Sequence, residues 1–323
     1  MSEALRFDQV SFRYDDEQVV NHVSFSIAQG EVVCLLGPSG CGKTTCLRLA
    51  AGMEQPQAGT ISLSGQVVSS ADRLAPPETR HIGFLFQEFA LFPHLSVYDN
   101  ICFGLTHLSA GEQKTRVLEL LKQVGLSGYA DKFPNSLSGG EQQRAALARA
   151  LAPSPKLVLM DEPFSNLDPQ LRDRMRDLTL HLLKQVGAAG LVVTHDAADA
   201  LRLADRIAVQ VDGAILQIDN PESVYRHPAN IDVAGMFGTV NLLKSVAGIQ
   251  GFRPADVSLT GAADDFSFEG ELVEARLMGA NWLCLIKRED GVGFEALLSG
   301  DTPPELGAQK FFVPQARLML FKE

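Results

Sequence analysis

Four short apolar runs recur in the first two hundred residues, and a polar or glycine-rich segment follows each of them. The runs lie at 31–36, 82–86, 157–160 and 191–194. Apolar runs of this length are typical of strands buried on both faces of a parallel sheet. Residues 4–36 alternate apolar and polar positions in the manner of antiparallel strands. The pattern predicts an α/β protein with a mainly parallel sheet and an antiparallel edge.

Between the second and third runs the apolar period becomes helical. Apolar residues recur at helical spacing over 117–124, and Gly125 is suited to end that helix. Ser138 and Glu141 have the spacing of a capping box, which predicts a helix from there through Ala150. We therefore expect a helical subdomain over about 88–152.

The composition shifts around 235–238. Beyond this point, strand-like pieces at 272–277, 282–286 and 311–313 are separated by glycines and acidic turns, as in a small β-barrel. The sequence thus predicts a core domain over 1–235 and a small C-terminal β-barrel domain over 236–323.

The first apolar run leads into a glycine-rich loop with the phosphate-binding pattern G-x-x-x-x-G-K-[ST], which reads Gly37-Pro38-Ser39-Gly40-Cys41-Gly42-Lys43-Thr44. The glycines allow backbone amides to point at phosphate oxygens, and the helix that follows from Thr45 adds partial positive charge. Lys43 is suited to reach the outer phosphates, and Thr44 to hold Mg²⁺. The strand and helix on either side favour a nucleotide site over a chance match.

Polar residues follow three of the apolar runs, where ligands bind in open α/β sheets. They are Gln87, the pair Asp161 and Glu162, and His195. Asp161 has the position of a Mg²⁺ partner, and Glu162 that of a general base for water. The alternatives are a loop glutamine, solvated carboxylates and a structural histidine. All of these residues follow apolar runs, and this shared placement favours a single functional site.

Two further features each allow two interpretations. Gly139 and Gly140, in the first turn after Ser138, leave the helix amides unshielded, which gives either a second anion site or a plain helix cap. Tyr14 could stack on adenine or pack at the edge of the core.

The charge and cysteine content narrow the function classes. The net charge is −11, with 28 Lys and Arg against 39 Asp and Glu, which argues against a nucleic-acid partner. The apolar runs are too short to span a membrane, and residues 1–6 lack the features of a secretory signal. The five cysteines have no C-x-x-C spacing, which favours reduced cytosolic thiols. Cys41 lies beside Lys43, so we expect either a lowered thiol pKa or a small residue without that role.

In chain order, these features resemble the ATP-binding subunits of ABC transporters over almost the whole chain. The resemblance rests on the phosphate loop, Gln87, LSGGEQQR at 137–144, LVLMDEP at 157–163 and His195. The 137–144 segment is diagnostic because other phosphate-loop classes lack it. In this family two copies pack head to tail, and this signature of one copy closes over the nucleotide of the other. The resemblance implies a homodimer that uses ATP and Mg²⁺ and drives separate transmembrane permease subunits.

The resemblance also assigns roles to the matching residues. It implies that Thr44 and Asp161 attend Mg²⁺, that Gln87 senses metal and water, and that Glu162 polarises the attacking water. It implies that His195 contacts the γ-phosphate.

The nucleotide-binding residues implied by the resemblance are shared between the two copies. One copy supplies Tyr14 for adenine and 37–45 for the phosphates, and the other supplies Ser138, Gly139, Gly140 and Glu141. Asp168 links the two sites. Asn166, Ala197 and Ala198 depart from the family pattern, which usually has alanine at the first position and acidic or amide residues at the other two.

The tail resembles the small β-barrel of many importer ATPases, with Phe252-Arg253-Pro254 at its characteristic strand start. That resemblance implies import, at the cytoplasmic face of the membrane, with an extracytoplasmic solute-binding protein as an indirect partner. The runs 80–88, 91–95 and 150–153 look most like the ferric-iron import ATPases. Polyamine, sulfate, molybdate and sugar importers are the alternatives, because no residue here selects the ion.

Two rival classes predict other features. A soluble ABC ATPase acting on DNA or ribosomes predicts a basic surface or long heptad insertions, and the sequence has neither. A small-molecule kinase would leave the 137–144 segment unexplained.

Overall fold

The computed structural model describes residues 2–245 and 248–321. The chain divides into two compact units, Met1–Pro221 and Glu222–Glu323. This boundary lies earlier than 235/236, because the segment before residue 236 packs with the tail. The guanidinium of Arg253 lies 4.1 Å from the ring centroid of Tyr225, and it donates a hydrogen bond of 3.3 Å to the Ala234 carbonyl.

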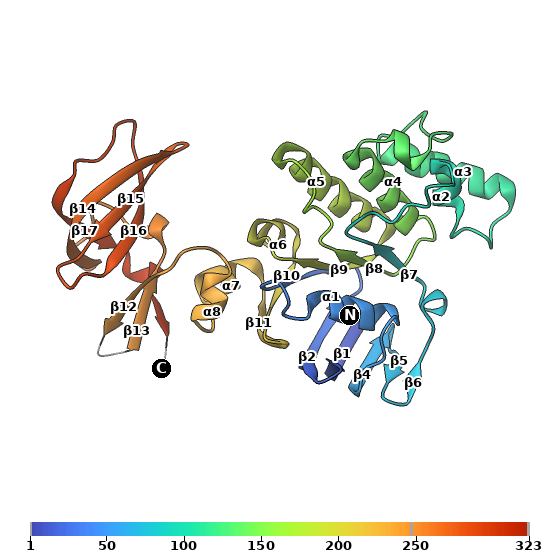
Figure 1. Ribbon diagram of the computed structural model, residues 1–323, viewed down its shortest axis with the longest axis horizontal. Helices are drawn as coiled ribbons and strands as arrows, with labels where there is room; N and C mark the ends of the chain where they lie inside the picture. The colour runs from blue at the N-terminus through green and yellow to red at the C-terminus, as the bar shows by residue number, and fades with distance from the viewer. Residues whose placement is uncertain (1, 246–247, 322–323) are drawn as a thin grey trace. The chain divides into compact units, whose positions relative to one another are not determined.

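A six-stranded sheet forms the centre of the first unit (Figure 1). Its order is β11-β10-β3-β9-β8-β7, and β11 alone runs antiparallel to its neighbour. Four of its parallel strands are the predicted apolar runs, which confirms the mainly parallel sheet. The strand bounds are β3 (Val32–Leu36), β7 (Ile82–Leu85), β8 (Leu157–Asp161), β9 (Ala189–Thr194), β10 (Arg206–Val211) and β11 (Ala214–Asp219).

The alternating strands form a second, antiparallel sheet of their own, in the order β2-β1-β4-β5-β6. They are not an edge of the parallel sheet, because they pair with one another in a separate sheet, whose buried residues face a core shared with the helix α1 and the parallel strands. Phe7 and Phe25 stack there with ring centroids 4.8 Å apart. The elements are β1 (Glu3–Tyr14), β2 (Glu17–Ala28), β4 (Ala58–Leu63), β5 (Gln66–Ser70), β6 (Arg73–Leu74) and α1 (Lys43–Ala51).

The predicted helical subdomain is present, with capped helices. Ser109 and Ser138 start two of the helices, each in a capping box with the glutamate three residues later. Helix α4 packs against β7 and α5. The helices of the first unit are α2 (Val97–Cys102), α3 (Ala110–Gln123), α4 (Gly139–Leu151), α5 (Pro169–Val186) and α6 (Ala197–Leu203), with short 3-10 turns η1 (Pro77–Thr79) and η2 (Pro134–Ser136). Within the described ranges, no helix is long and apolar enough to cross a membrane.

The second unit is a small antiparallel β domain, as predicted. A three-stranded sheet, β12-β13-β18, and a four-stranded sheet, β16-β15-β14-β17, contribute to it. Phe268 lies at the centre of its core, with its ring 5.2 Å from that of Phe294 and 5.4 Å from that of Phe311. Its elements are α7 (Pro221–Arg226), α8 (Ile231–Gly235), β12 (Asn241–Ser245), β13 (Gly248–Phe252), η3 (Pro254–Asp256), β14 (Phe266–Met278), β15 (Asn281–Lys287), β16 (Gly293–Ser299), β17 (Gly307–Val313), η4 (Gln315–Arg317) and β18 (Met319–Phe321).

Candidate active site

The glycine-rich loop connects the fully buried strand β3 to helix α1 and leaves no room for side chains at two positions. A Cβ atom at Gly37 would collide with the carbonyl oxygen of Gln210. Gly42 has φ +98°, and a Cβ atom there would collide with the Val19 carbonyl. Glycine is therefore required at both positions by close approach of backbone.

Lys43 is folded back over this loop. Its Nζ donates hydrogen bonds to the carbonyl oxygens of Gly37 at 2.8 Å and Pro38 at 2.7 Å, and its side chain is buried. Both acceptors are neutral, so the ammonium has no carboxylate partner in these contacts. A bound phosphate would offer it stronger, charge-assisted hydrogen bonds.

Cys41 contradicts the expectation of a lowered thiol pKa. Burial raises the pKa of the Cys41 thiol, and this effect outweighs the opposing ammonium of Lys43, whose Nζ lies 3.9 Å from Sγ. The alternative interpretation, a small buried residue, fits the site.

Gln210 is a buried polar residue beneath the loop that the sequence analysis missed. Its Nε2 donates a hydrogen bond of 2.8 Å to the Cys41 carbonyl, and its side chain is fully buried. One signal was available, because Gln210 interrupts the otherwise apolar strand 207–211. A buried amide inside such a strand must find a hydrogen-bond partner.

Thr44 and Asp161 meet at the carboxyl edge of the sheet. The Thr44 hydroxyl donates a hydrogen bond of 3.0 Å to Oδ1 of Asp161, the last residue of β8. Burial raises the pKa of Asp161, and the hydrogen bond from Thr44 opposes this shift. In the described part of the chain, no cluster of three or more His, Cys, Asp or Glu could hold a metal ion. A hydroxyl and one carboxylate nevertheless fit Mg²⁺, which usually takes its remaining ligands from water and substrate phosphates.

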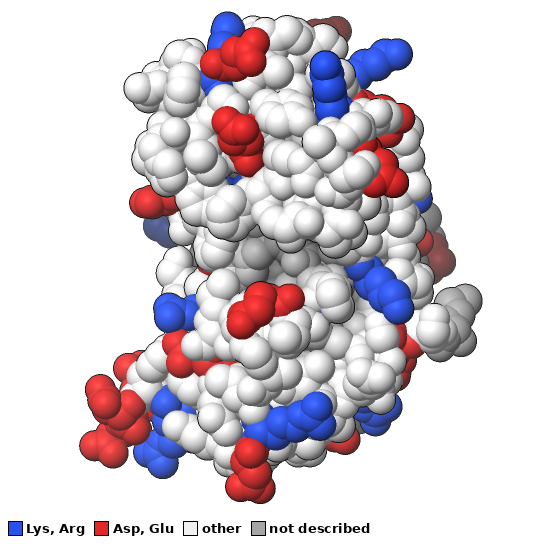
Figure 2. Space-filling view, turned by 90° about the vertical axis from the view of Figure 1, so that its right-hand side faces the viewer, with Lys and Arg blue, Asp and Glu red and all other residues white. Residues whose placement is uncertain are grey.

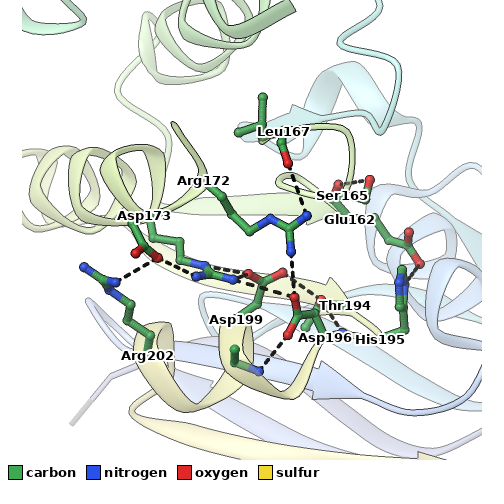
Figure 3. A network of polar contacts seen from close by, with 12 residues as sticks. Glu162, Ser165, Leu167, Arg172, Asp173, Thr194, His195, Asp196, Asp199 and Arg202 are labelled. Atoms are coloured by element: carbon green, nitrogen blue, oxygen red, sulfur yellow. Dashed lines mark hydrogen bonds and ion pairs between the residues drawn. The ribbon is translucent and has the colours of Figure 1, made fainter. Parts of the chain in front are cut away.

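Glu162 lies between Gln87 and His195. Its Oε1 is 2.9 Å from Nδ1 of His195, and its Oε2 accepts a hydrogen bond of 3.4 Å from Nε2 of Gln87 (Figure 3 shows the contact with His195). Its φ of +43° is in the left-handed region, which turns the chain directly after Asp161. The structure thus brings together the predicted residues that follow β7, β8 and β9, and the two adjacent carboxylates have different partners.

Beside His195 lies a network of arginines and aspartates that the sequence analysis did not predict (Figure 3). Arg176 is buried, and its Nε donates a hydrogen bond of 2.6 Å to Oδ1 of Asp199. The Thr194 hydroxyl donates to Oδ2 of the same carboxylate at 3.0 Å. Burial raises the pKa of Asp199, and Arg176 opposes this shift. These residues come from α5, β9 and α6, so no local sequence pattern indicates the network.

The 138–141 segment starts helix α4 and is internally paired. The backbone N–H and the hydroxyl of Ser138 each donate a hydrogen bond of 2.8 Å to Oε2 of Glu141. These hydrogen bonds lower the pKa of Glu141 to about 2. A Cβ atom at Gly140 would collide with the side chain of Leu171, whereas Gly139 faces open space. Gly140 thus packs closely against α5, and a larger residue there would require the Leu171 side chain to move.

Two other predicted site residues, Asp168 and Tyr14, form hydrogen bonds with residues of the same chain. Asp168 caps helix α5, and its Oδ1 accepts a hydrogen bond of 3.0 Å from the Leu171 amide. Tyr14 ends β1 with 39% of its surface exposed, and its hydroxyl donates to Oε1 of Glu54 at 3.2 Å. Its ring is therefore accessible for stacking.

The sequence of this chain is similar to those of several import proteins. A family model described as ABC transporter matches residues 20–165. The Fe(3+) ions import ATP-binding protein FbpC 2 of Haemophilus influenzae is 47% identical over 70% of this chain. The spermidine/putrescine import protein PotA of Chromobacterium violaceum is 39% identical over 95% of this chain and 94% of its own length. The sulfate/thiosulfate import protein CysA of Pseudomonas putida is 42% identical over 87% of this chain and 86% of its own length. The match spans only 64% of the length of the iron relative.

Solved structures agree with these matches. The cbiO1 protein of Clostridium perfringens, part of an ABC transporter complex, has a TM-score of 0.64 and 27% identity over 70% of this chain and 91% of its own. The ATP-binding cassette MJ0796, in a dimeric post-hydrolysis state with ADP and Pi, has a TM-score of 0.60 and 31% identity over 67% of this chain and 98% of its own. The chain therefore belongs to the ATP-binding proteins of the ABC transporter family.

Proposed function

We propose that this chain is the ATP-hydrolysing subunit of an ABC importer. The observation that carries the proposal is the position of Glu162, which lies between Gln87 and His195 directly after the strand that ends in Asp161, the partner of Thr44. A carboxylate beside a phosphate loop and a metal-binding hydroxyl is suited to accept a proton from water.

In the proposed reaction, the loop amides and Lys43 bind the phosphates of ATP. Lys43 exchanges the carbonyl oxygens of Gly37 and Pro38 for phosphate oxygens. Thr44 and Asp161 would hold Mg²⁺, and the bound ion would neutralise charge that develops on the phosphates.

Water then attacks the γ-phosphorus. Its proton passes to the Glu162 carboxylate as the bond to the β,γ-bridging oxygen breaks, and ADP and inorganic phosphate result. The contact of 2.9 Å between His195 Nδ1 and Oε1 of Glu162 orients the histidine ring for contact with the γ-phosphate. Gln87 donates a hydrogen bond to the other carboxylate oxygen of Glu162, and from there its side chain would contact the attacking water and bound Mg²⁺.

The proposal extends to a second copy of the chain. The exposed start of helix α4, 138–141, supplies amides for the γ-phosphate in the other copy, and Tyr14 stacks on adenine. The capping box uses the amides of Ser138 and Glu141, and Gly139 and Gly140 place no side chain in front of the amides between them. Asp168 links the two composite sites.

We further propose ferric iron as the transported solute, with separate permease subunits at the cytoplasmic face of the membrane and an extracytoplasmic solute-binding protein. The iron relative and the runs 80–88, 91–95 and 150–153 support this assignment. Polyamine and sulfate are alternative solutes, because relatives named for their import are also similar to this chain. Molybdate and sugar are further alternatives. Uptake of radiolabelled ferric iron, spermidine and sulfate by reconstituted transporter tests it. Uptake of spermidine or sulfate without iron would overturn the iron assignment.

A soluble ABC ATPase that acts on nucleic acid is less well supported. On the face drawn in Figure 2, Lys and Arg are interspersed with Asp and Glu and form no basic patch there. Capture of permease subunits from detergent-solubilised membranes favours the importer, whereas capture of DNA or ribosomes instead would favour the rival. Phosphate release without an acceptor substrate excludes a kinase.

Glu162→Gln tests the catalytic assignment. The amide cannot accept the proton, so we expect ATP binding to persist while kcat falls about 10²- to 10⁴-fold. Glu119→Gln, on the exposed face of α3, is the matched control and should keep wild-type turnover. Ordinary turnover in Glu162→Gln would remove Glu162 from the proposed role.

A further inference from the structure

The guanidinium of Arg172 joins two loops beside the candidate site (Figure 3). Its Nη1 donates a hydrogen bond of 2.9 Å to Oδ2 of Asp196, and its Nη2 donates one of 3.2 Å to the carbonyl of Leu167. Asp196 directly follows His195, and Leu167 directly precedes Asp168. One side chain on α5 therefore connects the segment that carries the histidine to the segment before the α5 cap.

Both of these segments also attach to Glu162. The Ser165 hydroxyl donates to the Glu162 carbonyl at 3.0 Å, so the 165–168 loop starts against the backbone of Glu162. The His195 ring contacts the Glu162 carboxylate at 2.9 Å. Arg172 closes this arrangement into a ring, because it supplies a second connection between the two segments.

An arginine suits this position for a specific reason. Its planar fork presents two N–H groups in fixed directions, which a lysine ammonium does not. Among the described residues, the buried Nε atom of Arg172 has no hydrogen-bond partner. Leaving a buried donor unpaired carries a free-energy cost. The hydrogen bonds at the two Nη atoms must offset this cost. They also fix where the guanidinium lies.

We propose that Arg172 is a positioning residue that couples the 165–168 loop to His195. A displacement of this loop, which the proposed function places at the boundary with the second copy, is transmitted through Arg172 to Asp196 and so to the adjacent histidine. This inference rests on the proposed function for its role in catalysis. The physical linkage itself does not depend on hydrolysis.

Arg172→Lys tests the inference directly. Lysine can keep the charge beside Asp196 but cannot hold Leu167 at the same time. We expect the Nδ1 and Nε2 signals of His195 in ¹⁵N-histidine NMR spectra to move, with a melting temperature within about 3 °C of wild type. The His195 signals are assigned among the seven histidines by their loss in His195→Asn. Arg172→Ala, which removes both contacts, is a second variant. If it does not fold, Arg172→Lys still provides the test.

Arg202→Ala is the matched control. Arg202, on α6, forms exposed ion pairs of 2.9 Å with Asp173 and Asp177 on α5, and neither contact involves Asp196 or Leu167 directly. We expect this variant to leave the histidine signals in place. If Arg172 had only a packing role, the His195 signals would stay in place in Arg172→Lys, as they do in Arg202→Ala.

The kinetic measurement completes the test. In Arg172→Lys we expect kcat to fall about 10- to 100-fold, with ADP affinity unchanged and the Hill coefficient for ATP lowered towards one. Unmoved His195 signals would overturn the linkage, and moved signals with wild-type kcat and Hill coefficient would overturn its role in hydrolysis. Moved signals in a chain whose wild type does not hydrolyse ATP would keep the linkage and refute the proposed function.

Discussion

Glu162 has a backbone conformation that non-glycine residues rarely adopt. Its φ of +43° follows directly on the strand that ends with Asp161, and its amide donates a hydrogen bond of 2.9 Å to the Val193 carbonyl. Such conformations persist only where the surroundings hold them, and they often occur at functional sites. The turn gives two adjacent acids separate partners, with Asp161 on Thr44 and Glu162 on the histidine. The sequence could predict both carboxylates but not this strained backbone.

The raised pKa of Cys41 leads to a prediction about alkylation. Because the thiolate is the reactive form, we expect alkylation at pH 7 to be slower than that of free cysteine, whose pKa is about 8.5. The rate of Cys41 alkylation should continue to rise as the pH increases above the pKa of free cysteine. Alkylation should inactivate the ATPase, and bound ATP should protect it. Iodoacetamide inactivation followed from pH 7 to pH 10 measures this.

The control for this measurement is Cys41→Ser, which should resist inactivation. Cys34 and Cys46 are fully buried, and burial raises their thiol pKa values as well, to about 12 for Cys46. Cys102 is the partly exposed competitor. Equal inactivation of Cys41→Ser would exclude Cys41 as the target.

At the scale of elements, helix α1 is held at its carboxyl end by one buried side chain. Arg80 donates hydrogen bonds to the carbonyls of Leu49, Ala50 and Ala75 and to the hydroxyl of Ser69. A cation suits a helix carboxyl end, where carbonyls lack intrahelical partners. Burial lowers the pKa of Arg80 to about 10. The helix that begins at the phosphate loop is thus anchored at its other end.

Arg80→Met tests this anchoring. It removes the hydrogen bonds that Arg80 donates to the carbonyls of Leu49, Ala50 and Ala75, of which Leu49 keeps one from the Gly52 amide, so we expect the free energy of unfolding to fall by about 2–4 kcal/mol. Urea unfolding followed by circular dichroism measures the loss, and hydrogen exchange should accelerate in residues 43–51.

The exposed Arg73→Met is the control and should change the stability by no more than about 0.5 kcal/mol. If Arg80→Met unfolds at the same urea concentration as the control, the anchoring role is wrong.

The sequence predicted the individual strands and helices better than it predicted how they pack together. Each apolar run became a parallel strand, and Ser138 became a helix cap, because these signals are local. The separate antiparallel sheet was not predicted, since alternation indicates a strand with one buried face but not what covers it. Gln210 and Arg172 depend on contacts between segments far apart in the chain, so local spacing could not indicate their partners.

At the scale of the whole molecule, the boundary between units depends on a contact that the sequence did not indicate. Arg253 stacks on Tyr225 and donates hydrogen bonds to the carbonyls of Tyr225 and Ala234. Two short helices therefore group with the β domain, although the composition changes only after them. The small β domain itself was predictable, because its strands are regularly spaced between glycine and acidic turns.

The central claim is that the phosphate loop of one chain and the 138–141 segment of another form one site. Light scattering of Glu162→Gln with saturating ATP tests it most directly. Ser138→Arg in the same background removes the helix cap and places a bulky side chain over the helix amides, so it should block association. The exposed Ser127→Arg is the matched control. We expect ATP to raise the mass from 34.9 kDa to twice that value in Glu162→Gln and in the control, but not in Ser138→Arg. A mass of 34.9 kDa for Glu162→Gln with ATP bound, or an ATP-dependent dimer that survives Ser138→Arg, would contradict it.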